Sequence, residues 1–274
     1  MKHRQASPSP THQHNRRAWD AMADNRQRFT APARDEDFRS LLATVDPAGW
    51  LGARIAGRRV LCLAAGGGKH GPIYAAAGAQ VTVVDLSPRM LALDREVAAE
   101  RGLELQTVEA SMDDLSALPR GGFDLVIHPV STCYVPDVLA VYRQVARVTA
   151  DGGLYISQHK QPGSLQTDAR PSGGGYVLRE PYFRSGPLPP VEGSLHREAG
   201  TLEFLHRWED LLGGLCRSGF VVEDLIEPPH GDPSAERGTF AHRSHYVPPY
   251  VRVKARRIRE AGGSVAGGNG VWTP

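Results

Sequence analysis

The chain has 274 residues, enough for one sizeable hydrophobic core in a large domain or in a domain with a cap. Its composition, 41% hydrophobic and 23% charged, is that of an ordinary globular protein and excludes a fibrous or wholly disordered class. The net charge of +2 gives no electrostatic argument for a nucleic-acid partner. We interpret the basic stretch KARRIRE near the C-terminus as a solvated face.

The cysteines and the hydropathy of the chain indicate the cellular compartment of the protein. Cys62, Cys133 and Cys216 are widely spaced, with neither a CxxC pair for zinc nor a disulfide framework. No apolar run approaches the ~18 residues of a membrane helix, and the N-terminal segment lacks the apolar centre of a secretion signal. The sequence therefore predicts a cytoplasmic protein without a membrane partner.

The N-terminal part predicts a leader followed by cap helices. Residues 1–14 are rich in Pro, Ser, Gln and His and are expected to be disordered. In the predicted cap, residues 15–55, the stretch NRRAWDAMADNRQRF carries Trp19, Met22 and Phe29 at loosely helical intervals, and DEDFRSLLATV is a second helix candidate.

From Val60 the chain alternates between short apolar strands and helices. VLCLA, VTVVDL, LELQTVEA, FDLVIHP and LYISQ are predicted strands, and the helices between them include SPRMLALDREVAAERG and PDVLAVYRQVARVTADGG. Such an alternation is typical of βαβ units and predicts a parallel sheet with helices on its faces. The predicted main domain spans residues 56–260.

The second half carries an insertion and returns to regular structure. Residues 161–200 are dense in Gly and Pro but hold three aromatic residues, so we expect an ordered cap insertion over a site. An amphipathic helix over LEFLHRWEDLLGGLCRSG, a strand over FVVEDLIEP and a last strand over YVRVKAR are expected to follow. Residues 261–274 are expected to form a flexible tail.

A glycine cluster follows the first predicted strand. Gly66, Gly68 and Gly71 spell GxGxxG, and Asp85 lies 19 residues after Gly66, at the end of the next strand. Glycines allow close approach of the backbone to a ligand, and a strand-end carboxylate accepts two hydroxyl hydrogen bonds. The pattern alone is compatible with a dinucleotide site, with another cofactor site or with a turn that binds nothing.

The surrounding motifs narrow this choice. The run from VLCLAAGGGKHG through VTVVDLSPRML, VEASMDDL and FDLVIHPVSTCY to ADGGLYIS resembles the class I S-adenosylmethionine-dependent methyltransferases, and among them the small-molecule group related to quinone-biosynthesis methylases. The resemblance covers residues 60–158. It implies a Rossmann-like, doubly wound α/β fold with a seven-stranded sheet whose last strand is antiparallel. Cys62 stands where this family usually has an acid, and Ala64 where it usually has a glycine.

The resemblance also implies cofactor-binding residues. Asp85 would bind the ribose hydroxyls and Leu86 would flank the adenine, while Ser111, in place of the usual acid, and Met112 would complete the adenine site. His128 would lie beneath the methyl group. The implied cofactor is S-adenosylmethionine, and the loop residues implied to shape its site are Ala64, Gly66 and Gly68.

Methyl transfer from a sulfonium mainly requires alignment and exclusion of water, and a base is needed only where the acceptor must lose a proton. The candidate catalytic residues are His128, Tyr134 and His159, because they lie at or beyond the carboxyl ends of strands. Lys160 shares this position, although a solvated side chain is expected for it. The remaining histidines lack a metal-ligand spacing such as HExxH, so no metal is expected.

Three functions are compatible with these patterns. The leading hypothesis is a methyltransferase that acts on a small molecule. An NAD(P)-dependent oxidoreductase using the literal GxGxxG, and a non-catalytic binding module with a degenerate pocket, are the alternatives. Because a methyltransferase must shield its reactive centre, Trp19 and Tyr182 from the two cap segments are predicted to lie on the substrate side of the pocket, above His128.

Overall fold

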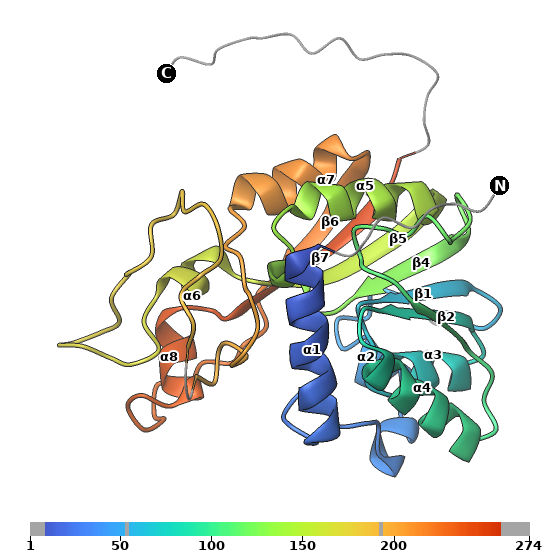
Figure 1. Ribbon diagram of the computed structural model, residues 1–274, viewed down its shortest axis with the longest axis horizontal. Helices are drawn as coiled ribbons and strands as arrows, with labels where there is room; N and C mark the ends of the chain where they lie inside the picture. Colours follow the sequence, from blue (N-terminus) through green and yellow to red (C-terminus); the bar gives the residue numbers. More distant parts are fainter. Residues whose placement is uncertain (1–8, 53–54, 192–193, 259–274) are drawn as a thin grey trace, which may run out of the picture.

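The computed structural model describes residues 9–52, 55–191 and 194–258. Its centre is a seven-stranded sheet with the strand order β3-β2-β1-β4-β5-β7-β6 (Figure 1). The strands are β1 Arg59–Leu63, β2 Gln80–Asp85, β3 Gln106–Glu109, β4 Phe123–His128, β5 Thr149–Lys160, β6 Phe220–Ile226 and β7 Tyr250–Arg257.

The direction of the strands gives the sheet its functional edge. β1 to β5 pair in parallel, whereas β7 runs antiparallel to both β5 and β6. The predicted doubly wound α/β sheet with an antiparallel last strand is therefore confirmed. Because the five parallel strands end on the same side, their carboxyl ends form one common edge, where such sheets bind ligands.

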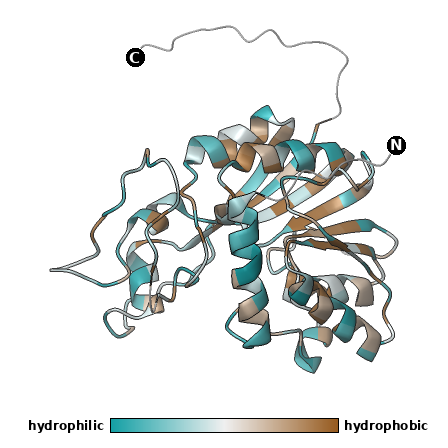
Figure 2. Cartoon of the chain, in the orientation of Figure 1, coloured by the Kyte–Doolittle hydropathy of each residue, from teal (hydrophilic) through white to brown (hydrophobic). Residues whose placement is uncertain are grey.

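Helices cover both faces of the sheet (Figure 1). The α-helices are α1 Pro10–Asp24, α2 Leu41–Val45, α3 His70–Ala76, α4 Pro88–Glu100, α5 Val138–Val148, α6 Pro162–Gln166, α7 Gly214–Arg217 and α8 Phe240–Tyr246. Short 3-10 helices span Asp35–Phe38 and Thr132–Tyr134, and a π-helical turn spans Glu209–Gly213. α2, α3 and α4 lie on one face and α5 and α7 on the other, while α6 and α8 lie beyond the end of the sheet. Figure 2 shows apolar strands between these layers and a mostly polar α1.

α5 shows how the sequence fixes one of these layers. Val138, Val141, Val145 and Val148 recur at helical spacing, and all are at most 1% exposed against the sheet. Asp137 caps the helix by accepting hydrogen bonds from the amides of Leu139 and Ala140.

The N-terminal leader is shorter than predicted. Disorder was expected through residue 14, but α1 already begins at Pro10, with the Ser9 side chain accepting a hydrogen bond from the amide of His12. Residues 1–8 lie outside the described residues. Polar contacts of the first turns to distant segments, described below, hold this part of the chain in a helix.

The predicted helix over residues 202–219 is wrong in its first third. Residues 202–207 have no helical structure, and helical turns begin only at residue 208. Tertiary hydrogen bonds take the backbone instead. The amide of Phe204 donates to the carbonyl of Cys133, and the carbonyl of Glu203 accepts from the amide of Leu188. These pairings outweigh the helical periodicity of the leucines.

The insertion at residues 161–200 joins a second segment that sequence patterns did not predict, the helix α8. Arg243 of α8 is 1% exposed and donates hydrogen bonds to the carbonyl oxygens of Ser164, Thr167 and Asp168. One buried guanidinium thus ties α8 to the end of α6. The predicted tail at 261–274 lies outside the described residues, and no helix within the described ranges is long and apolar enough to cross a membrane.

Candidate functional site

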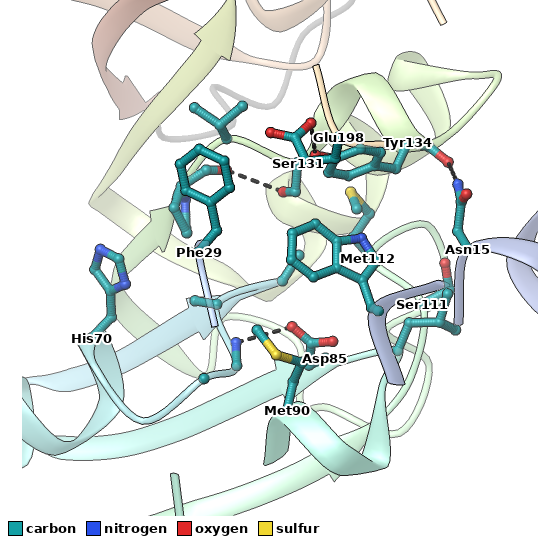
Figure 3. A pocket seen from close by; sticks show the side chains of 18 of the residues that line it. Asn15, Phe29, His70, Asp85, Met90, Ser111, Met112, Ser131, Tyr134 and Glu198 are labelled. Atoms are coloured by element: carbon teal, nitrogen blue, oxygen red, sulfur yellow. Dashed lines mark hydrogen bonds between the residues drawn. The ribbon is translucent and has the colours of Figure 1, made fainter. Parts of the chain in front are cut away.

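A cavity of about 490 Å³ lies at the carboxyl ends of the parallel strands. Its walls come from α1, the loop after β1, the ends of β2 and β4, the segment after β3, and the insertion. The lining residues used below are Asn15, Trp19, Phe29, Ala64, Gly66, His70, Asp85, Leu86, Ser111, Met112, Tyr134, Gln158, Glu198 and Tyr250. Figure 3 shows Asp85 at one end of the cavity and Tyr134 with Glu198 at the other.

The loop after β1 forms the floor of the cavity. Ala64 has a φ of +46°, a left-handed conformation that costs a non-glycine residue on the order of 1 kcal/mol. Ala64 therefore adopts the strained backbone at a position where the methyltransferase resemblance expects glycine. The amide of Gly66 donates to Asp85 Oδ2 at 2.9 Å, and that of Gly67 donates to Asp94 Oδ2 at 2.9 Å. Asp94, from α4, thus supplies a carboxylate to the loop although Cys62 replaces the usual acid.

Two glycines of this loop have no room for a side chain. A Cβ on Gly66 would lie 2.9 Å from Asp85 Oδ2, so this glycine lets the loop approach the carboxylate. Gly68 has a φ of +73°, and its Cβ would lie 2.8 Å from the carbonyl oxygen of Leu93. Gly68 does not itself line the cavity. Its predicted role becomes that of shaping the loop against α4.

Gly68→Ala is expected to destabilise the fold by about 2 to 4 kcal/mol, because it adds backbone strain and a clash with a carbonyl that cannot rotate away. Gly102→Ala is the matched control, since Gly102 has a φ of +63° but nothing within 4 Å of the added Cβ. Urea unfolding of both variants gives the measurement. Equal losses in the two variants would show that packing against α4 does not matter.

Asp85 ends β2 beneath the cavity. Its Oδ1 accepts from the amide of Ser87 at 2.9 Å, and its Oδ2 accepts from Gly66, so each oxygen keeps a further acceptor site. Burial raises the pKa of Asp85 to about 6, although the hydrogen bonds from the Ser87 and Gly66 amides oppose the shift. The carboxylate is fixed, desolvated and able to accept two more hydrogen bonds from a ligand.

Leu86, Ser111 and Met112, which the resemblance assigns to the adenine, line the cavity together with Asp85. Ser111 is held by α1, because His12 Nε2 lies 3.3 Å from Ser111 Oγ and 3.1 Å from Asp113 Oδ2. The cavity lining thus contains both apolar side chains, Leu86 and Met112, and the Ser111 hydroxyl.

α1 closes the cavity from above. Trp19 lines it, as predicted, and its ring meets that of Tyr134 edge to face with centroids 5.5 Å apart. Asn15 is 2% exposed and donates to the carbonyls of Tyr134, at 2.9 Å, and of Leu202, at 3.0 Å. Ser87 Oγ donates to Asp20 Oδ1 at 2.6 Å. α1 is therefore fastened at the strand ends on both sides of the cavity.

A buried ionic cluster lies at the far end of the cavity. Lys160, expected to be solvated, is only 4% exposed and pairs with Glu198 and Glu203, and Glu203 also pairs with Arg197. The Tyr134 hydroxyl donates a hydrogen bond to Glu198 Oε2 at 2.6 Å. Burial opposes the charge of Lys160, but the surrounding negative charge, including both carboxylates, raises its pKa. The expectation of a solvated lysine was wrong because the insertion and the segment directly after it fold over the strand end and supply two counter-charges, Glu198 and Glu203.

Of the three predicted catalytic residues, the cavity lining contains Tyr134 but neither His128 nor His159. His128 Nδ1 lies 2.7 Å from the Tyr155 hydroxyl, and His159 lies between Thr132 Oγ1 at 2.9 Å and Ser157 Oγ at 2.8 Å. Burial lowers the pKa of both imidazoles to about 3. Both are neutral groups packed beneath the cavity, where His128 Nε2 has no hydrogen-bond partner among the described residues.

The prediction that Tyr182 covers the pocket is wrong. Its hydroxyl accepts a hydrogen bond from the amide of Trp208 at 3.0 Å, and its ring packs on a small apolar cluster of Leu165, Leu188 and Leu205. Tyr182 stabilises the insertion itself. Phe29 and Tyr250 are aromatic residues that do line the cavity.

His70 and Glu198 line the cavity without having been predicted. His70 begins α3 directly after the glycine loop, a position that points to the site, and burial lowers its pKa to about 4. Glu198 lies in a segment without periodicity, 38 residues after its partner Lys160, so no local pattern marks it. Among the described residues, no group of three or more His, Cys, Asp or Glu side chains is placed to hold a metal ion.

Known proteins resemble this chain over most of its length. The family model described as a methyltransferase domain matches residues 61–157. YbaJ, an uncharacterized methyltransferase of Bacillus subtilis (strain 168), is 34% identical over 232 residues, which are 80% of this chain and 91% of the relative. The chain belongs to the class I S-adenosylmethionine-dependent methyltransferases.

Further proteins similar to this chain are also methyltransferases. A ubiquinone biosynthesis O-methyltransferase of Xanthomonas oryzae is 36% identical over 104 residues, which are 38% of this chain and 44% of that protein. The crystal structure of an S-adenosylmethionine-dependent methyltransferase from Mesorhizobium loti superposes with a TM-score of 0.62 at 26% identity, covering 81% of this chain and 97% of that one. The oxidoreductase and the non-catalytic module are thereby set aside, and S-adenosylmethionine is the cofactor.

Proposed function

We propose that this methyltransferase transfers the methyl group to a small-molecule acceptor by in-line displacement. The observation that carries the proposal is a cavity at the carboxyl ends of the strands, with a fixed carboxylate at one end and the aromatic ring of Tyr134 at the other. When bound, S-adenosylmethionine supplies a methyl group on a sulfonium, which is already activated toward nucleophiles. The protein therefore has to bind the cofactor and the acceptor, align the two reacting groups and exclude water from them.

The residues at the Asp85 end fit this cofactor. Asp85 has two acceptor sites for the ribose hydroxyls, and the missing side chain of Gly66 leaves the backbone free to approach. Leu86, Met112 and Ser111 provide apolar surface and a hydrogen-bonding hydroxyl for the adenine. Ala64, with its left-handed backbone, lines the same cavity and would contact the cofactor there.

The other end suits a small acceptor. Trp19, Phe29, Tyr134 and Tyr250 line it, and α1 covers it. Their rings would stack on and desolvate a molecule of modest size, and a volume of about 490 Å³ is typical of a small-ligand site. The near-neutral net charge supports the same choice.

Isothermal titration tests the cofactor assignment. S-adenosylhomocysteine is expected to bind one site with a micromolar dissociation constant, and NAD(H) and NADP(H) are expected to give no binding heat. Incubation with labelled S-adenosylmethionine and a small-molecule extract tests the acceptor class by mass spectrometry. Label appearing only in protein or nucleic acid added to the same reaction would contradict a small-molecule acceptor.

A further inference from the structure

Glu198 places a carboxylate beside Tyr134 in the cavity, at the end opposite Asp85 (Figure 3). It comes from the insertion, outside the region of residues 61–157 that carries the methyltransferase match. Its side chain is 8% exposed, so the charge is largely withdrawn from water. A desolvated anion is costly unless it is paired and hydrogen-bonded.

The neighbours of Glu198 remove that cost and fix the carboxylate. Lys160 donates to Oε2 at 2.5 Å, and the Tyr134 hydroxyl donates to the same oxygen at 2.6 Å. Burial raises the pKa of Glu198, but the ammonium of Lys160 and these hydrogen bonds outweigh it, so the pKa lies below its ordinary value. An ionised carboxylate is an acceptor only, and its two oxygens offer more acceptor sites than the two donors on Oε2 occupy, so Glu198 keeps acceptor capacity for a ligand.

The cluster around Glu198 contains four charged side chains. Lys160 pairs with Glu203 as well, and Glu203 also pairs with Arg197, so two cations balance two anions behind the cavity wall. A buried ion pair is often replaceable by apolar residues without loss of stability. Glu203 is fully buried and does not line the cavity, whereas Glu198 does. Of the two carboxylates in the cluster, only that of Glu198 belongs to a residue that lines the cavity.

The backbone near Glu198 is hydrogen-bonded to α1, the helix that lines one wall of the cavity and that we call the lid. His14 Nε2 lies 2.9 Å from the carbonyl of Gly200, and Asn15 Oδ1 accepts from the amide of Leu202 at 2.8 Å. Glu198 therefore keeps its position relative to the aromatic rings that would hold an acceptor.

We propose that Glu198 is the acceptor-binding carboxylate of this enzyme. It accepts a hydrogen bond from an N–H or O–H group of the methyl acceptor and so orients the acceptor between the aromatic walls. The acceptor class is then a small hydroxy or amino compound with an apolar body. This inference rests on the proposed function, because it assigns the second half of the same cavity.

The test uses a library of matched pairs, each an aromatic or alicyclic hydroxy or amino compound beside its fully O- or N-methylated analogue. Ligand-observed NMR measures binding of each member to the full-length protein saturated with S-adenosylhomocysteine. The donor member of the binding pairs is expected to bind at least about tenfold more tightly, the worth of one hydrogen bond to a charged group. Equal binding within pairs, or no binding by any member, overturns the inference.

Two variants assign the preference to Glu198. Glu198→Gln keeps the shape but loses the charge, and the donor preference is expected to fall to within twofold. Glu203→Gln removes the same charge from the cluster without altering the cavity lining, and is expected to keep the preference. Retention of the preference in Glu198→Gln, or its loss in both variants, overturns the assignment. Failure of wild-type protein to bind S-adenosylhomocysteine would instead refute the proposed function.

Discussion

Asp85→Ala is expected to weaken binding of S-adenosylhomocysteine by on the order of 100-fold or more. The substitution removes two charge-assisted hydrogen bonds to the ribose, each worth about 1.5 to 3 kcal/mol, and each 1.4 kcal/mol is a factor of about ten. It also releases the amides of Gly66 and Ser87, which Asp85 holds at 2.9 Å each. Isothermal titration measures the affinity, and far-UV circular dichroism checks the fold.

A control must separate ribose binding from loop shape. Asp94→Ala suits this purpose, because Asp94 holds the amide of Gly67 through Oδ2 but does not line the cavity. The variant perturbs the loop without removing an acceptor for the ribose, and it is expected to weaken the affinity by at most about tenfold, the worth of one hydrogen bond. Unchanged affinity in a folded Asp85→Ala variant would refute the ribose assignment.

The sheet was predictable because its signals are local. Five apolar strands alternate with helices long enough for βαβ crossovers. The row of valines in α5 indicates which face of that helix packs on the sheet. Asp85 was predictable for the same reason, since the distance from the glycine loop along a βαβ unit is nearly constant. Periodicity and spacing thus predict the strands, the helices and the position of Asp85 in this half of the chain, whereas the roles of Leu86, Ser111 and Met112 follow only from the family resemblance.

The cap was less predictable because its structure depends on distant partners. Leucine spacing predicted a helix from residue 202, yet Phe204 bonds to Cys133 and Leu202 to Asn15. Lys160 was expected in solvent, because the two glutamates that neutralise it follow at least 38 residues later in an irregular segment. Tyr182 showed that an aromatic residue in a cap marks apolar packing without indicating which side it faces.

Deletion of residues 1–30 is expected to reduce methyl transfer by at least about 100-fold while largely preserving the sheet. The truncation removes Asn15, Trp19 and Phe29 from the cavity lining and so opens the reacting end to water. Among the described residues, neither of the two large core clusters on the faces of the sheet contains a residue of α1. The strands are therefore expected to stay folded. Incorporation of labelled methyl groups into a small-molecule extract measures transfer, and circular dichroism measures the fold.

A pair of substitutions on one helix separates lid closure from general stabilisation. Trp19→Ala removes a ring that lines the cavity and contacts Tyr134, whereas Arg17→Ala changes an exposed residue of the same helix. Trp19→Ala is expected to lower the transfer rate per folded molecule about tenfold or more, because water then reaches the reacting groups, and Arg17→Ala is expected to leave it unchanged. If Trp19 served only as a packing residue, its removal would lower the melting temperature but not the rate of the protein that remains folded. A truncated enzyme that transfers methyl groups at the wild-type rate would show that α1 is not the lid.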